Sequence, residues 1–176
     1  PLGQALTVIF SVFYGIISFS FSYYGEMITY LGMTAPMAGA AMVNWLKNPY
    51  KNSAQVRVNR LRLQELWVML PLAAVVTAVF FFLLRALGTA NLLPSTISVT
   101  TSFIAVYLLF RRSPFYALAY AANDIVLIVL WAMAAAEDIS YFSALICFAV
   151  FLANDIYGFV SWLKMQKKQR EELLEK

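Results

Sequence analysis

The chain has 176 residues, of which 62% are hydrophobic and 12% charged, with a formal net charge of +4 and a mean hydropathy of +0.72. This composition is too apolar for a soluble core and predicts a polytopic membrane protein. One cysteine and no histidine exclude a disulfide framework, a Cys/His metal cluster and any catalytic triad or dyad that needs imidazole.

Long apolar stretches occur along the whole chain. A membrane-spanning helix needs about 20 apolar residues, and six stretches qualify: 4–21, 24–46, 64–87, 94–111, 114–135 and 139–163. Pro36, inside the second stretch, predicts a kink. Residues 1–4 lack the charged start of a signal peptide, so we expect the first helix to be retained. We therefore predict an all-α fold with six crossings.

The basic residues are distributed very unevenly among the joins between these stretches. With six crossings, the joins after the second and fourth stretches lie on the same side of the membrane as the C-terminal tail. Of the thirteen lysines and arginines, only Arg85 lies on the other side. Basic loops stay in the cytoplasm, so the tail is predicted to be cytoplasmic in a bacterial inner membrane. The net charge thus has a topological cause and does not imply nucleic acid. The segment VRVNRLRL could also contact anionic lipid.

The chain also matches itself after a shift of 117 residues. The shift places Tyr24 on Tyr141 and VNWLK of the second stretch on VSWLK of the sixth. A helix and its counterpart are thus four crossings apart along the chain, so both cross the membrane in the same direction, as parallel repeats require. The fourth stretch has no counterpart, and we expect another helix upstream of Pro1.

These observations predict two parallel three-helix repeats joined by a connector helix. The expected regions are a partial first repeat (1–46), a cytoplasmic basic loop (47–63), a connector helix with its loop (64–93), a second repeat (94–165) and a cytoplasmic charged tail (166–176).

Two Asn-Asp pairs lie inside apolar stretches, Asn123-Asp124 and Asn154-Asp155. A mid-membrane aspartate costs about 2.5 to 3.5 kcal/mol on insertion scales, so we expect a function for Asp124. Asp155 lies nearer a helix end and could be solvated or paired with Arg111 or its neighbour. The simpler interpretation of the asparagines is an interhelical hydrogen bond, worth about 0.6 to 2 kcal/mol.

Helical periodicity extends both pairs into candidate binding stripes. Tyr120 and Trp131 share a stripe with the first pair, and Tyr157 shares one with the second. Thr7 overlays Asp124 under the shift, and Gln4 lies one turn before it. Trp45 and Trp162, beside lysines, are expected in an interfacial belt instead.

No lysine or arginine lies in the middle of a stretch, which disfavours a phosphorylated substrate. Amides, carboxylates and aromatic faces suit a neutral or cationic ligand with hydroxyls and an aromatic ring.

Three strings, FYGIISFSFSYYGEMITYL, RSPFYALAYAANDIVLIVLW and FLANDIYGFVSWLKM, resemble the PnuC family of bacterial nicotinamide riboside transporters. The resemblance implies a fold like that of the SWEET sugar carriers, with no enzymatic activity and no cofactor. It implies uptake of nicotinamide riboside by facilitated diffusion and alternating access, followed by phosphorylation by a cytoplasmic riboside kinase for NAD synthesis. The pyridinium would stack on Trp131 or a tyrosine, while Asn123, Asp124 and Asn154 take the carboxamide and ribose hydroxyls.

The same residues also suit other functions. The cargo could be another vitamin such as thiamine or riboflavin, or Asp124 could carry a proton. The chain could be a non-transporting channel or scaffold subunit, or, more remotely, an intramembrane enzyme that uses two aspartates. Faces of small residues would allow a homo-oligomer, for which a trimer is our guess.

Overall fold

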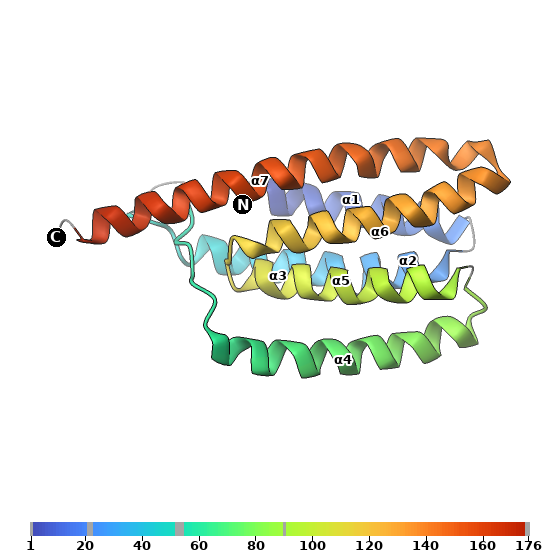
Figure 1. Cartoon of the computed structure of the whole chain (residues 1–176), viewed down its shortest axis with the longest axis horizontal. Helices are drawn as coiled ribbons and strands as arrows, with labels where there is room; N and C mark the ends of the chain where they lie inside the picture. The colour runs from blue at the N-terminus through green and yellow to red at the C-terminus, as the bar shows by residue number, and fades with distance from the viewer. Residues whose placement is uncertain (1, 21–22, 52–54, 90, 175–176) are drawn as a thin grey trace.

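A computed structural model describes residues 2–20, 23–51, 55–89 and 91–174. Its helical elements, shown in Figure 1, are α1 (Leu2–Ser20), α2 (Tyr24–Ile28), the π-helical turn η1 (Thr29–Thr34), α3 (Ala35–Leu46), α4 (Leu63–Ala86), α5 (Leu92–Phe110), α6 (Phe115–Glu137), the 3-10 turn η2 (Ile139–Tyr141) and α7 (Phe142–Leu174). In these residues the only β pairing is one isolated bridge between Pro49 and Val56. The expectation of an all-helical membrane protein is confirmed.

Five of the helices are individually long and apolar enough to cross a membrane. The second predicted stretch is the exception, because it is divided into α2, η1 and α3, which follow one another without a gap. Pro36 lies in the first turn of α3, directly after the π turn. A proline cannot donate the backbone hydrogen bond of a regular α-helix, and a wider turn beside it accommodates the change. The irregularity expected at Pro36 is thus a π-helical turn that ends at Thr34.

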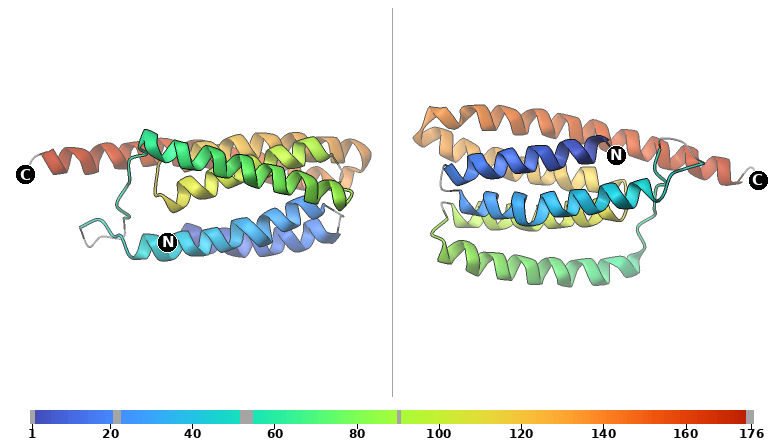
Figure 2. Two further views of the ribbon diagram at one scale, coloured as in Figure 1. Left: turned by 90° about the horizontal axis from the view of Figure 1, so that it is seen from below. Right: turned by 180° about the vertical axis from the view of Figure 1, so that it is seen from behind.

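The helices run side by side along the long axis of the molecule (Figures 1 and 2). Helix α4, the expected connector, lies at one edge, where it packs mainly against α5. Helix α7 extends past the other helices toward the C-terminus (Figure 1). We call the end of the molecule that carries the loop 47–62, the turn 111–114 and the last turns of α7 the basic end.

The basic end is held by polar contacts between segments far apart in the sequence. Arg111 forms an ion pair with Glu65, at 2.6 Å between Nη2 and Oε1, and its Nε donates to Oε2 at 3.1 Å. The suggested pairing of Arg111 with Asp155 is therefore wrong, because the start of α4 supplies a closer carboxylate. The Asn59 backbone N–H donates to the Arg112 carbonyl at 3.0 Å, which ties the loop to the α5–α6 turn.

Trp45 faces the protein and does not join an interfacial belt. It is 8% exposed, its Nε1–H donates to the Leu109 carbonyl at 3.2 Å, and its ring lies 5.1 Å from that of Trp162. The belt expectation for Trp45 is wrong because α5 offers a buried acceptor, which satisfies the indole N–H inside the bundle.

Candidate functional site

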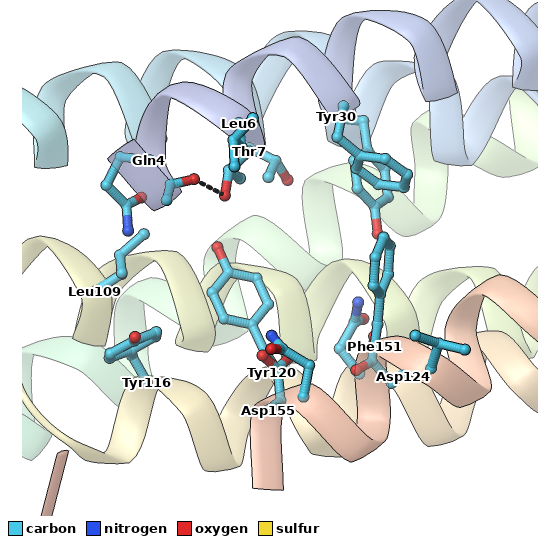
Figure 3. Close-up of a pocket in the computed structure, with 16 residues that line it drawn as sticks. Gln4, Leu6, Thr7, Tyr30, Leu109, Tyr116, Tyr120, Asp124, Phe151 and Asp155 are labelled. Carbon is cyan, nitrogen blue, oxygen red and sulfur yellow. Dashed lines mark hydrogen bonds between the residues drawn. The ribbon is translucent and has the colours of Figure 1, made fainter. Parts of the chain in front are cut away.

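A cavity of about 600 Å³ lies between α1, η1, α6 and α7, within the usual size range of small-molecule sites. In Figure 3, side chains from α1 face side chains from α6 and α7 across it. The residues that line it are Gly3, Gln4, Leu6, Thr7, Phe10, Tyr30, Thr34, Leu109, Tyr116, Tyr120, Asn123, Asp124, Val150, Phe151, Asn154 and Asp155.

Asn123 is held in place by hydroxyl groups of α5. Its Oδ1 accepts hydrogen bonds from Thr101 at 2.8 Å, Ser102 at 3.1 Å and Ser98 at 3.3 Å. Only 2% of Asn123 is exposed. Because three donors converge on the carbonyl oxygen, the amide nitrogen is left as the hydrogen-bond donor, and Asn123 also interacts with the Tyr30 side chain at the cavity. A side chain fixed in this way can donate hydrogen bonds to a ligand without paying much ordering entropy.

Two carboxylates face the same cavity. Asp124 is 4% exposed and its Oδ2 has no hydrogen-bond partner, while Asp155 is half-buried on the neighbouring helix. The two side chains interact directly across the α6–α7 contact. Among the residues that the structure describes, no lysine or arginine lines the cavity. Two carboxyl groups in contact do not both ionise readily, but a site that has these groups and no basic side chain still favours a cation over an anion.

Aromatic rings complete the lining on both sides. Tyr30 comes from η1 and Tyr120 from α6 (Figure 3). Phe10 packs edge-on against Phe151, with ring centroids 4.9 Å apart, and so joins α1 to α7 at the cavity wall. Ring faces beside carboxylates suit a flat, positively charged ring, which gains both stacking and cation–π attraction.

At the end opposite the basic end, the cavity is closed by packed aromatic side chains. Tyr14 and Trp131 are both buried, and Trp131 Nε1–H donates to the Tyr14 hydroxyl at 2.8 Å. Tyr30 packs on Tyr14 at 4.4 Å between centroids, and Tyr23 packs on Trp131 at 4.9 Å.

The cavity brings together seven of the nine residues singled out from the sequence: Gln4, Thr7, Tyr120, Asn123, Asp124, Asn154 and Asp155. Trp131 belongs to the aromatic closure and does not line the cavity. Tyr157 is 74% exposed and also lies outside the lining.

Sequence reasoning missed Phe10, Tyr30 and Thr34 as lining residues. The 117-residue shift could have found Thr34, since it overlays Phe151 and both line the cavity. Sequence reasoning also missed Glu26, which is fully buried. A glutamate near the start of the second apolar stretch was visible in the sequence, as was its lack of a nearby basic residue.

The same shift pairs further lining positions: Gly3 with Tyr120, Leu6 with Asn123, and Thr7 with Asp124. Both members of each pair face the cavity, but the hydrogen-bonding and charged groups come mostly from the later member.

Comparison with known proteins places this geometry in a family. The sequence model of the nicotinamide mononucleotide transporter family matches residues 2–164. A curated relative, the nicotinamide riboside transporter PnuC of Neisseria mucosa, is 28% identical over an alignment of 162 residues that covers 88% of this chain and 61% of the relative. The chain thus spans about three fifths of that protein's length.

A crystal structure of the vitamin B3 transporter PnuC has the same fold, with a TM-score of 0.79 and 23% sequence identity. The match covers 94% of this chain and 73% of the other. The resemblance found in the sequence is confirmed. The chain belongs to the nicotinamide mononucleotide transporter family, whose members are multi-pass membrane transporters and not enzymes.

Proposed function

We propose that this protein transports nicotinamide riboside, the unphosphorylated nucleoside, across the membrane. The observation that carries the choice is the charge of the cavity, whose described lining has two aspartates and no lysine or arginine. A pyridinium cation is attracted to such a site, whereas the phosphate of a mononucleotide would find no cation to compensate it. The name of the curated relative from Neisseria mucosa, a riboside transporter, agrees with this choice.

In the proposed binding mode, the nicotinamide ring lies against the rings of Tyr30 and Tyr120, beside the carboxylates of Asp124 and Asp155. The Asn123 amide nitrogen donates to the carboxamide or to a ribose hydroxyl, because its carbonyl oxygen is already occupied by α5. The cavity volume of about 600 Å³ is sufficient for a nucleoside.

Transport would proceed by alternating access between two bundles that rock about the cavity. The support is that residues 117 positions apart meet at both ends of the cavity. Tyr14 is hydrogen-bonded to Trp131 at one end, and Trp45 packs against Trp162 at the other. Equivalent residues meet in this way on a two-fold axis, and such an axis relates parallel repeats. Breaking one aromatic contact while keeping the other would open one side at a time.

In the cell, the substrate would enter by facilitated diffusion through the inner membrane and be trapped by a cytoplasmic riboside kinase that feeds NAD synthesis. The basic end would face the cytoplasm, because lysine and arginine concentrate there. The protein would act as a homo-oligomer, with each copy containing its own cavity.

Uptake of radiolabelled nicotinamide riboside into liposomes that contain the purified protein tests this function. Saturable uptake is expected, with competition by unlabelled riboside and not by nicotinamide mononucleotide or thiamine. Facilitated diffusion predicts the same initial rate with and without an uncoupler. A rate that collapses with the uncoupler would instead indicate proton coupling through Asp124 and Asp155, and uptake that never saturates would refute a carrier.

A further inference from the structure

A second cavity, of about 510 Å³, lies at the basic end and shares no lining residue with the first. It is formed by the loop that follows α3 and by the last turns of α7. The residues that line it are Pro49, Tyr50, Lys51, Arg57, Val58, Arg60, Gln166, Gln169, Arg170 and Leu173. Four of these carry a positive charge and none carries a negative one.

Gln169 fixes the loop against α7 and so gives the cavity a defined shape. It is 5% exposed; its Oε1 accepts from the Val58 backbone N–H and its Nε2 donates to the Val56 carbonyl, both at 3.0 Å. Arg57 lies between the two clamped residues, and Arg170 follows Gln169 on the helix. The clamp therefore holds guanidinium groups from two distant segments at one cavity.

The charge of this cavity is only partly compensated within the protein. Glu172 forms an ion pair with Lys51 and also accepts from the Tyr50 hydroxyl at 2.9 Å. In the part of the chain that the structure describes, no carboxylate forms an ion pair with Arg57, Arg60 or Arg170.

A further guanidinium stands behind this cluster. Buried Nε and Nη1 atoms of Arg112 have no hydrogen-bond partner. Burial, together with the neighbouring charges of Arg111 and Arg57, lowers the pKa of Arg112. Positive charges that repel one another in the protein are relieved when an anion binds between them. Guanidinium is also the side chain best matched to phosphate, since it donates two parallel hydrogen bonds to its oxygens.

We propose that the cavity at the basic end binds a phosphate-bearing anion, which is held by Arg57, Arg60 and Arg170. Two sources have this chemistry, the headgroup of an anionic lipid and a soluble phosphorylated small molecule. Helix α7 has 33 residues, more than the about 20 that cross a bilayer, so its last turns emerge at the membrane surface, where both sources can reach the cavity. Bound there, the anion joins α7, which lines the transport cavity, to the loop between α3 and α4.

The test compares two triple variants that remove the same charge. One is Arg57→Gln with Arg60→Gln and Arg170→Gln. The control is Arg62→Gln with Lys164→Gln and Lys168→Gln, three basic residues that do not line the cavity. All six side chains are exposed, and helix content by circular dichroism checks that both variants fold.

The soluble arm titrates inorganic pyrophosphate into protein in a neutral detergent by calorimetry. The lipid arm measures thermal unfolding in nanodiscs of phosphatidylcholine with or without phosphatidylglycerol. A soluble ligand predicts saturable pyrophosphate binding that weakens at least about tenfold in the cavity variant and is kept in the control. A lipid ligand predicts stabilisation by phosphatidylglycerol that is lost in the cavity variant alone.

An additional variant separates specific recognition from general charge. Replacing the same three arginines by lysine keeps the charge but removes the paired hydrogen bonds, so binding intermediate between the parent and the glutamine variant is expected. Absence of any response to pyrophosphate and to phosphatidylglycerol would overturn the proposal. Equal losses in the cavity variant and the control would overturn it as well, because the effect would then be one of net charge.

Discussion

Replacing Asn123 with alanine should weaken riboside binding and leave the fold intact. In the proposed mode the amide nitrogen donates to the ligand, and its removal leaves a buried polar group of the ligand unpaired. Such a loss costs about 1 to 3 kcal/mol, which corresponds to about a 5- to 150-fold higher dissociation constant. The assay is a calorimetric titration of nicotinamide riboside into the purified protein.

The cost of the same substitution to stability should lie at the lower end of this range. Three α5 hydroxyls lose their shared acceptor, but serine and threonine in a helix can bond the carbonyl four residues earlier. Thr101 already does so, at 3.0 Å from the Ile97 carbonyl. The net loss is therefore about 1 kcal/mol, the usual contribution of one hydrogen bond.

Asn44→Ala is the matched control. The Asn44 side chain also links two helices, since its Nδ2 donates to the Phe110 carbonyl at 2.7 Å, but it does not line the cavity. It should lower stability by a similar amount and leave riboside affinity unchanged. Equal affinity losses in both variants, or normal affinity in Asn123→Ala, would refute the assignment of Asn123 to the site.

Two further substitutions test the packing around the site. Gly15→Ala should lower the thermal unfolding midpoint, because the new Cβ would lie 2.5 Å from the Leu31 Cγ and overpacking costs about 1 to 3 kcal/mol. Gly39→Ala is the control, since its new Cβ meets open space; its stability should stay the same or rise by up to about 1 kcal/mol. The same midpoint in both variants would contradict the packing of α1. Tyr14→Phe removes the acceptor of the buried Trp131 N–H and should destabilise the protein by about 1 to 3 kcal/mol in the same melting assay, whereas an unchanged midpoint would mean that this hydrogen bond does not hold the closed end.

The sequence was sufficient for the helices because bilayer thickness fixes the length of an apolar stretch. The predicted stretch 64–87, for example, is α4 at Leu63–Ala86. The sequence was not sufficient for α7, which was predicted as 139–163. The helix continues beyond its apolar part to Leu174 as a charged segment, and composition does not show that the two parts form one helix. Nor does composition distinguish a proline kink from the π turn at Thr29–Thr34.

For the site, the polar pairs were informative because asparagine and aspartate are rare at membrane depth. Periodicity was weaker, since it assigns a residue to a helix face but not to the neighbour that this face meets. Trp131 shares a face with Asn123, yet Tyr14 of α1 receives its indole N–H. Gly3 and Leu6 carry no chemistry that identifies a site, and only the repeat brings them to positions equivalent to polar ones.

The choice between riboside and mononucleotide is the most direct test of the account. Both compounds would be titrated by calorimetry into the variant with Arg57→Gln, Arg60→Gln and Arg170→Gln, so that phosphate binding at the basic end does not contribute. Saturable binding of nicotinamide riboside and no binding of nicotinamide mononucleotide are expected, because the described lining of the cavity has Asp124 and Asp155 and no lysine or arginine. Equal or tighter binding of the mononucleotide would contradict the charge argument on which the proposed function rests.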